Sequence, residues 1–353
     1  MKIYIRSAAA ISPQKTFGQD SFLGEPVNYT GNRLQILEPD YTKLIDVKSL
    51  RRMSRIIKMG VATATACLQQ AGEKNPGAII TGTAYGCLED TSVFLTQLVE
   101  RNEESPPPTP FIQSTHNTVG AQIALLLKCH SYNNTFVHRG FSFESALLDA
   151  ILLLKEKEAA TVLVGSADEL TDTSFSILQR FGLYKQKEIV NFDLYKHPSK
   201  GTIAGEGTAF FFLSNEHSAE DYAQLDGMTT FYKPKDITES EAQISTFLAT
   251  QGIDINEIDL VVTGKNGDTR DDAVYEKLQQ TIFKNRRTIN YKHLCGEYPT
   301  AVSFALWMSA TILKTGTVPE VCGYNNGGNI KKILLYNHYQ NLHHSLLLLS
   351  ACE

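Results

Sequence analysis

The stretch Gly201-Thr202-Ile203-Ala204-Gly205-Glu206-Gly207-Thr208-Ala209 leads directly into the apolar run Phe210-Phe211-Phe212-Leu213. A glycine-containing turn before a short apolar run is typical of a buried strand in a layered α/β protein. Near the end of the chain, Ser345-Leu346-Leu347-Leu348-Leu349-Ser350 likewise follows a polar turn that contains histidine. Each half also runs strand, helix, strand, helix, strand. We therefore predict a duplicated α/β unit, with halves at residues 1–215 and 216–353.

Short apolar runs alternate with longer segments of helical period along the chain. The predicted strands are residues 2–11, 78–81, 135–138, 161–165, 208–213, 222–232, 260–263, 333–336 and 345–349. The predicted helices are residues 47–70, 89–101, 119–129, 142–157, 239–251, 271–284 and 300–314. The proline-rich segment 105–110 is predicted to be an extended loop, because consecutive prolines disfavour a helix and remove backbone donors.

Composition limits the classes of protein to consider. A chain of 353 residues, 42% apolar and 20% charged, can bury a large core. Its 33 basic and 38 acidic residues give a net charge of −5 without a long basic run, so we expect no nucleic-acid partner. The six scattered cysteines lack metal-site spacing, which indicates reduced thiols in the cytoplasm, with no metal and no cofactor. We expect no signal peptide and no membrane span, because no apolar run approaches about 20 residues.

Four segments, in the correct order, resemble the β-ketoacyl-[acyl carrier protein] synthases of the thiolase superfamily. They are residues 81–89, 117–124, 159–169 and 201–209, the last of them preceded by Phe192-Asp193. The resemblance implies a thiolase-like five-layer αβαβα sandwich of two pseudo-repeated halves, usually assembled as a dimer. The second half matches more thinly and is shortened. There, residues 259–264 resemble the strand that delivers the first active-site histidine, and residues 292–296 resemble the loop that delivers the second.

The resemblance also shows which reactive side chains are missing. Members of this family condense acyl chains with a cysteine, activated at a strand-to-helix turn, and two histidines. Aligned with them, Gly140 stands at the cysteine position, Gly264 at the first histidine and Glu297 at the second. The family's lysine is retained as Lys292. The Gly-Phe-Gly-Gly loop of the oxyanion hole corresponds roughly to residues 339–344.

Glycine cannot form an acyl thioester, and both histidines that would stabilise the enolate of decarboxylation are replaced. We therefore predict a catalytically degenerate homologue that acts like a chain length factor. It would be the heterodimer partner of an active ketosynthase in fatty acid, polyene or polyketide biosynthesis. Two alternatives stay open. One is an atypical 3-oxoacyl-[acyl carrier protein] synthase or acyltransferase that uses His138, Ser142 and Glu297, and the other is a homodimeric module that binds acyl groups or carrier protein.

The resemblance also implies a subunit contact, because the family pairs the strand before the nucleophile across its dimer axis. The residues expected there are Asn133, Asn134, Thr135, Phe136, Val137 and His138. Pairing would protect an edge strand that is otherwise an aggregation hazard. The candidates for lining an acyl tunnel are Phe111, Phe136, Phe141 and Phe143. Plain core packing is the alternative for these aromatic side chains.

Three positive charges, Arg52, Arg55 and Lys58, lie on one side of a predicted helix. They form a candidate docking patch for the acyl carrier protein, which is acidic in this family's systems. The alternative is a solvated helix face.

Other polar residues have both a chemical and a structural interpretation. His138 is either a substitute base or an interfacial histidine bonded to a backbone carbonyl. His116 and Glu297 are either an acid–base pair or two unrelated loop residues. The turn with Asn266, Asp268, Asp271 and Asp272 superficially resembles a calcium loop. It lacks the alternating spacing and the terminal glutamate of an EF-hand, and acidic residues are also expected where a helix begins.

Overall fold

The structure is a computed structural model that describes residues 2–18, 22–106, 108–323 and 329–352. Within these residues, ten strands form one sheet in the order β10-β9-β11-β12-β8-β1-β7-β5-β3-β4. The first half supplies β1 (Ile3–Ile11), β3 (Ala78–Gly82), β4 (Tyr132–Phe136), β5 (Thr161–Asp168) and β7 (Gly207–Ser214). The second half supplies β8 (Ala223–Tyr232), β9 (Leu260–Thr263), β10 (Thr288–Asn290), β11 (Lys332–Tyr339) and β12 (His343–Ser350). A separate ribbon pairs β2 (Thr30–Gly31) with β6 (Ile189–Val190).

The two halves have the same strand order. The first runs β1-β7-β5-β3-β4 and the second runs β8-β12-β11-β9-β10. In each half the first and last strands pair antiparallel, and the last strand is antiparallel to its other neighbour. The remaining three strands are parallel in both halves. A short antiparallel pairing between β1 and β8 joins the halves. The predicted boundary at 215/216 lies in the loop between β7 and β8.

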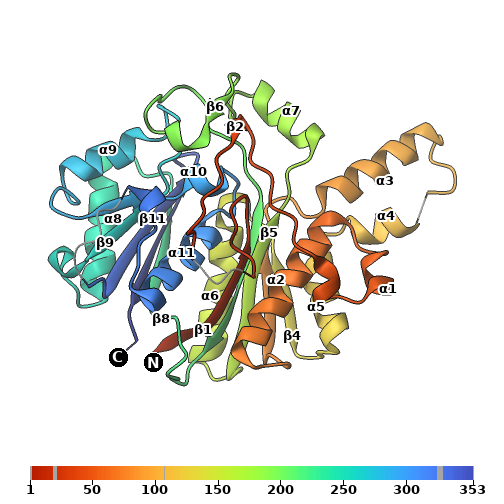
Figure 1. The fold of residues 1–353 in the computed structure, drawn as a ribbon, viewed down its shortest axis with the longest axis horizontal. Coiled ribbons are helices and arrows are strands. Elements are labelled where there is room, and N and C mark those ends of the chain that lie inside the picture. The colour runs from red at the N-terminus through yellow and green to blue at the C-terminus, as the bar shows by residue number, and fades with distance from the viewer. Residues whose placement is uncertain (1, 19–21, 107, 324–328, 353) are drawn as a thin grey trace.

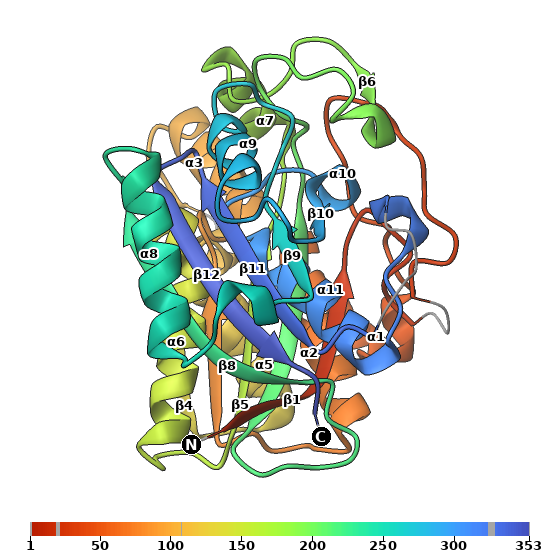
Figure 2. The same cartoon turned by 90° about the vertical axis from the view of Figure 1, so that its left-hand side faces the viewer.

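Helices complete five layers (Figures 1 and 2). The helices are α1 (Val47–Leu50), α2 (Arg55–Ala71), α3 (Leu88–Glu100), α4 (Pro108–Gln113), α5 (Thr118–Leu127), α6 (Ser142–Lys155), α7 (Asp172–Arg180), α8 (Ile237–Thr250), α9 (Ala273–Gln280), α10 (Lys292–Cys295) and α11 (Val302–Thr315). α2 and α5 cover the outer face of the first half-sheet, and α8 and α9 cover that of the second. α6 and α11 lie between the half-sheets. The predicted αβαβα sandwich is therefore confirmed.

The central position of α11 follows from its composition. Every residue from 302 to 313 is buried, so the helix has no solvated face. A helix that is apolar all round is stable only inside a protein. Two of its hydroxyl groups are satisfied locally, since Ser303 donates to the carbonyl of Thr300 and Thr311 donates to that of Trp307, whereas the buried Ser309 hydroxyl has no partner among the described residues.

Two local predictions were wrong. The predicted helix 47–70 is interrupted, because Met53 is buried and Ser54 has extended backbone, so the second helix begins at Arg55. The proline-rich segment is not wholly extended, because α4 begins at Pro108. Prolines at the first turn remove amides that have no intrahelical partner, so a helix can begin there.

All six cysteines are free thiols. Among the described residues, none of the helices has both the length and the apolar character that crossing a membrane requires.

Candidate functional site

The turn between β4 and α6 corresponds to the predicted nucleophile turn. A 3₁₀ turn covers Arg139–Phe141, with Arg139 at a left-handed φ of 47°. Buried Ser142 closes this turn, because its hydroxyl donates to the carbonyl of Arg139 at 2.9 Å and accepts from the amide of His138 at 2.8 Å. The Ser142 hydroxyl therefore holds the backbone of the turn together.

Gly140 has no room for a side chain. A Cβ atom at this position would lie 2.9 Å from Cβ of Tyr339 and 2.9 Å from Cγ of His343. Such contacts are too close for packed carbon atoms, so a larger residue would have to displace the β11–β12 hairpin. The hairpin turn carries Gln340 and Asn341 at left-handed φ values of 54° and 50°. The position assigned to the missing cysteine is therefore filled from the far end of the chain.

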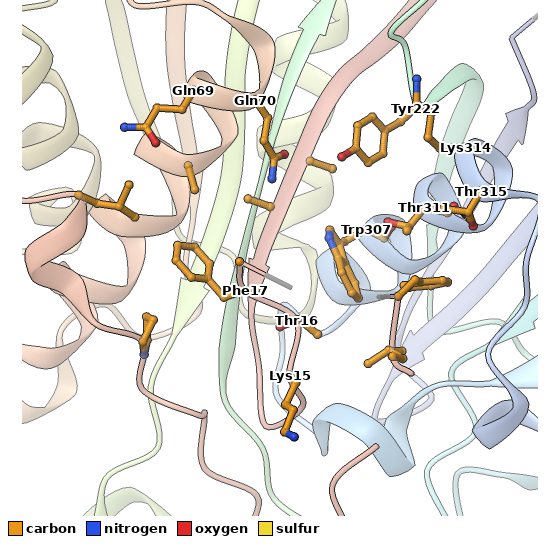
Figure 3. A pocket seen from close by; sticks show the side chains of 18 of the residues that line it. Lys15, Thr16, Phe17, Gln69, Gln70, Tyr222, Trp307, Thr311, Lys314 and Thr315 are labelled. Carbon is orange, nitrogen blue, oxygen red and sulfur yellow. Dashed lines mark hydrogen bonds between the residues drawn. The ribbon is translucent and has the colours of Figure 1, made fainter. Parts of the chain in front are cut away.

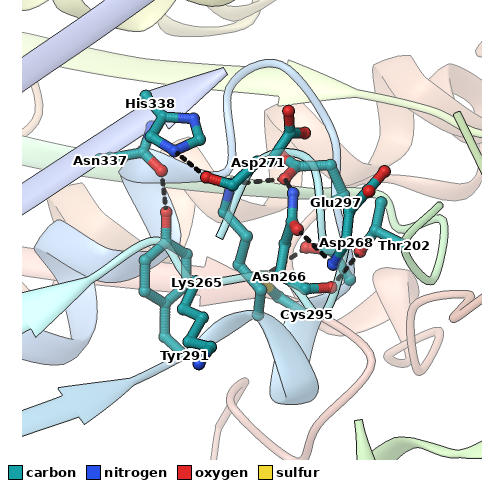
Figure 4. A network of polar contacts seen from close by, with 12 residues as sticks. Thr202, Lys265, Asn266, Asp268, Asp271, Tyr291, Cys295, Glu297, Asn337 and His338 are labelled. Atoms are coloured by element: carbon teal, nitrogen blue, oxygen red, sulfur yellow. Dashed lines mark hydrogen bonds and ion pairs between the residues drawn. The ribbon is translucent and has the colours of Figure 1, made fainter. Parts of the chain in front are cut away.

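Glu297 lies in a buried polar cluster behind this hairpin. Its Oε2 atom accepts from Lys292 Nζ at 2.6 Å and from the amide nitrogen of Asn266 at 2.8 Å. Figure 4 shows the amide of Asn266 directed at the Glu297 carboxylate. Lys292 is 1% exposed and Glu297 is 6% exposed. The other carboxylate oxygen, Oε1, accepts no hydrogen bond from the described residues.

The cluster surrounds a small cavity of about 20 Å³, lined in part by Tyr184, Asn266, Asp271, Glu297 and Tyr339. A space of this size holds about one water molecule. It is too small for an acyl chain.

The loop after β9 begins with Gly264, the position assigned to the first histidine. A Cβ atom at Gly264 would collide with Asn337 and lie 2.7 Å from the Tyr275 hydroxyl. The side chain from this loop that contacts Glu297 is Asn266, two residues further on. The sequence analysis did not assign Asn266 this contact. The only signal for it was the Asn-Gly pair that marks a tight turn after the strand.

Glu144 adds a second carboxyl group near Lys292. It lies on α6 one turn after Gly140 and is 2% exposed. Burial raises the pKa of Glu144 to about 7, while the charge of Lys292 opposes the rise. Burial, aided by the charges of Asp268 and Glu297, similarly raises the pKa of Asp271 to about 6. The sequence analysis missed Glu144 because an acid in the first turn of a helix is ordinarily solvated.

The nearby histidines are held neutral. Burial lowers the pKa of His293 to about 4, and its ring contacts the carbonyl of Val321. Burial likewise holds the pKa of His338 well below its usual value, and its Nε2 atom contacts the carbonyl of Asp271. Neither ring makes a hydrogen bond to Glu297 within the described residues.

The structure separates other predicted groups. His116 is exposed and lies against Gly86, whereas Glu297 is buried and bonded to Lys292 and Asn266, which favours the interpretation as two unrelated loop residues. The ring of His138 is stacked on that of Phe141, with a centroid distance of 5.7 Å.

The carboxylates of the calcium-like turn are used within the protein. Asp272 accepts from the amides of Asn266 and Gly267 at 2.8 Å. Asp268 pairs with Arg270 at 2.5 Å and accepts from the amide of Gly201. These bonds fix the loop that presents Asn266.

The four predicted tunnel residues lie in different surroundings. Phe143 is fully buried against Phe211, with a centroid distance of 5.8 Å. Phe136 packs at the edge of the central core, and Phe141 contacts the ring of His343. Phe111 is 55% exposed. None of the four lines the cavity beside Glu297.

The predicted docking patch is only partly available to a partner. Arg55 forms a bidentate pair with buried Glu206 at 2.5 and 2.6 Å and also bonds Glu38. Its guanidinium therefore stabilises the fold. Arg52 is exposed and Lys58 is partly exposed.

A basic groove lies next to the Glu297 cavity and shares Tyr184 with it. The groove has a volume of about 750 Å³ and is lined by Arg180, Lys185, Lys187 and Lys200. Lys185 is 2% exposed and its ammonium donates to Ser199 and to the carbonyl of Gly267.

A larger cavity, of about 840 Å³, lies between the loop after β1 and the carboxyl ends of α2 and α11 (Figure 3). Phe17, Tyr222 and Trp307 form part of its wall, with Lys15 and Lys314 nearby. It shares no lining residue with the Glu297 cavity.

The predicted subunit contact lies on an edge strand. β4 is the last strand of the sheet and pairs with β3 alone among the described residues. Exposed apolar side chains lie on α5, on α6, on the strand itself and directly after it. They are Leu125 at 68%, Leu148 at 46%, Leu152 at 43%, Tyr132 at 46% and Val137 at 44% exposure. An unpaired edge with apolar flanks is typical of a protein interface.

Comparison with solved structures places this architecture in a known class. The chain superposes over its whole length on "The ishigamide ketosynthase/chain length factor", with a TM-score of 0.83, 18% identity and 99% of that chain covered. A beta-ketoacyl synthase from Burkholderia phymatum STM815 gives a TM-score of 0.81 at 14% identity, with both chains fully covered. A third match is the AntDE:AntF complex, a type II PKS acyl-carrier protein with its ketosynthase bound to the hexaketide. Its TM-score is 0.74 at 15% identity, with 99% of both chains covered.

The fold is thus that of the thiolase-like ketosynthases. Residues 35–184 match the family model of the beta-ketoacyl synthase N-terminal domain. Segment 35–184 is thus similar to that domain, and the full-length structural matches share its fold. No curated protein sequence matches the chain.

Proposed function

We propose that this chain is a catalytically degenerate ketosynthase homologue that pairs with an active ketosynthase, in the manner of a chain length factor. The observation that carries the proposal is the closed space at Gly140. Neither a cysteine nor any other side chain fits there while Tyr339 and His343 keep their positions. The acyl-carrying step would therefore take place in the partner subunit.

The interface supports this role. β4 would pair across the subunit boundary, with Asn133, Asn134, Thr135, Phe136, Val137 and His138 at the contact. Burying the exposed leucines of α5 and α6 would remove apolar surface from water, which is the main favourable term in association. A fold that has lost its chemistry but retains this edge is suited to assembly with a second subunit.

The basic groove beside the closed site suits an acidic carrier protein. Arg180, Lys187 and Lys200 line the groove, which shares Tyr184 with the Glu297 cavity. Complementary charge speeds encounter between partners. We propose that the carrier protein approaches the assembled pair along this groove, and that Arg52 and Lys58 extend the positive surface.

The enzymatic alternative has no observation in its favour. Ser142, one of the residues that this alternative would use, donates its hydroxyl proton to a backbone carbonyl. Glu297 is paired with Lys292.

Co-expression with candidate ketosynthases tests the proposal. We expect a one-to-one heterodimer by size exclusion and native mass spectrometry. Leu125→Glu combined with Leu148→Glu should abolish the heterodimer, because it places charge beside the edge strand. Val47→Glu, at an exposed apolar position on α1, is the matched control and should leave the heterodimer intact.

Activity assays separate the alternatives. The isolated chain should show no acyl adduct and no carbon dioxide release with acyl and malonyl carrier proteins. A chain that forms only a homodimer would refute the pairing. Turnover by the chain alone, lost on Ser142→Ala, would establish the enzymatic alternative.

A further inference from the structure

A histidine, an aspartate and a cysteine meet at the junction between the two halves. None of them lines the cavity beside Glu297. His217 and Asp221 lie in the loop between β7 and β8, and Cys352 follows β12. One ligand atom from each residue lies within 4.8 Å of the other two. The Nδ1 atom of His217 is 3.0 Å from Oδ2 of Asp221.

This donor set matches the preferences of zinc. Imidazole nitrogen, carboxylate oxygen and thiolate sulfur bind Zn²⁺ at about 2.0–2.3 Å, in a tetrahedral arrangement. Such bonds separate the ligand atoms from one another by about 3.3–3.7 Å. The three groups therefore need to move by only about 1 Å to hold the ion. The side chain of His217 is 42% exposed, which leaves a path for the ion and for a water as fourth ligand.

The surroundings orient the aspartate as an outer shell would. Arg6 Nε donates to Oδ1 of Asp221 at 2.5 Å, and the same guanidinium bonds the carbonyl of Glu216. The amide of Ser218 donates to Oδ2 at 2.7 Å. These bonds hold Oδ2 toward His217, and fixed outer-shell contacts of this kind raise metal affinity.

The charges around the cluster are mixed. Burial and the charges of Asp221 and Asp226 raise the pKa of the Cys352 thiol to about 11, and the charges of Lys314 and Lys2 oppose the rise. Zinc brings two positive charges, which the carboxylate and the thiolate neutralise, and the charge of Arg6 is already paired with Asp221.

We propose that His217, Asp221 and Cys352 bind a Zn²⁺ ion, which ties the end of the second half to the loop that joins the halves. On binding, the Cys352 thiol releases its proton to solvent and the sulfur bonds the metal. The site is independent of any ketosynthase partner.

The test uses the full chain without an affinity tag, stripped of metal and titrated with Zn²⁺ against a chromophoric chelator. We expect one ion per chain. Cys352→Ser should weaken binding at least about 100-fold, and His217→Gln at least about 10-fold, because each loses a direct ligand. Cys129→Ser, at a partly exposed cysteine elsewhere, is the matched control and should bind as the parent does.

Cobalt substitution reports the sulfur bond directly. Co²⁺ should give a thiolate-to-metal charge-transfer band in the parent and in Cys129→Ser, and none in Cys352→Ser. Zinc should also raise the Tm of the parent but not that of Cys352→Ser. Absence of the band, or a band that survives in Cys352→Ser while that variant remains folded, would overturn the proposal.

Discussion

Gly140 and Glu297 stand at two positions that we assign to missing catalytic side chains, and the protein closes them in different ways. At Gly140 the space is occupied by the Cβ atom of Tyr339 and by Cβ and Cγ of His343, so packing determines which side chains fit. At Glu297 the space is occupied by a buried ion pair with Lys292, so electrostatics determine which substitutions the position accepts. No side chain can be added at Gly140 unless its neighbours move. Neither Lys292 nor Glu297 can be removed alone without leaving the other as an unpaired buried charge. Substitutions can test each half of this comparison.

The largest effect on stability is expected at the buried ion pair of Lys292 with Glu297. Lys292→Ala should lower the free energy of unfolding by about 3–5 kcal/mol, because it leaves Glu297 buried without its partner. Lys292→Met combined with Glu297→Leu should restore stability to within about 1 kcal/mol of the parent, or exceed it, since no buried charge is left unpaired. Urea unfolding measures both.

Lys332→Ala is the control, because Lys332 pairs with Glu257 at the surface. It should cost at most about 1 kcal/mol. A loss for Lys292→Ala no greater than that of Lys332→Ala would contradict the idea that charge governs this position.

Glu144 provides a further test, because its burial should make the stability of the protein depend on pH. Its folded pKa of about 7 lies above the ordinary value of 4.5, so the folded state binds the proton more tightly. The stability this contributes is fully present below pH 4.5 and is lost as pH rises through 7. Between these limits the parent should lose about 2–3 kcal/mol that Glu144→Gln does not lose.

Comparing the two proteins across the same pH range removes the contribution of the buried histidines. His293 and His344 have pKa values lowered to about 4, so their stability is present above pH 6.5 and is lost as pH falls toward 4. Glu220→Gln, at a carboxyl with an 84% exposed side chain, should follow the parent curve. Parallel curves for the parent and Glu144→Gln would mean that Glu144 titrates as a solvated acid.

The sequence was sufficient for the layers of the fold. The apolar strand 208–213, its counterpart 345–349 and the largely apolar α11 each require burial, and the family resemblance supplied the order. It was also sufficient for the turn at Gly140, because a strand and a helix flank that glycine directly. Local pattern, reinforced by a known topology, determines such features.

The side chains that fill the site could not be predicted in the same way. The contact of Gly140 with Tyr339 and His343 joins residues about two hundred positions apart, and no local pattern encodes it. The choice between Gly264 and Asn266 depends on how the loop leaves β9, which the bonds of Asp272 determine. Burial of Glu144 depends on the second half packing over α6. Each of these is a tertiary contact between segments that are distant in sequence.

A smaller effect on stability is expected at the closely packed Gly140. Gly140→Ala should lower the free energy of unfolding by about 1–3 kcal/mol, because the added methyl group forces the hairpin to move. Gly31→Ala is the control, since a Cβ atom there would lie 3.8 Å from its nearest neighbour and should change stability by less than about 0.5 kcal/mol. Equal stability of Gly140→Ala and the parent in thermal unfolding would show that the hairpin yields easily, and the closed-site argument would fail.

The smallest effect is expected on the rate at which the carrier protein associates along the basic groove. In the proposed heterodimer, Lys187→Glu combined with Lys200→Glu should slow association with an acidic carrier protein about 3–10-fold at low salt, because charge at an interface rim acts mainly on encounter. The difference should shrink at high salt, as screening weakens the field. Lys74→Glu, at an exposed lysine on the loop after α2, is the control and should leave the rate unchanged. Stopped-flow measurement also distinguishes the two positive surfaces: a larger decrease for Arg52→Glu than for the groove variant would move the docking site to the patch at the start of α2.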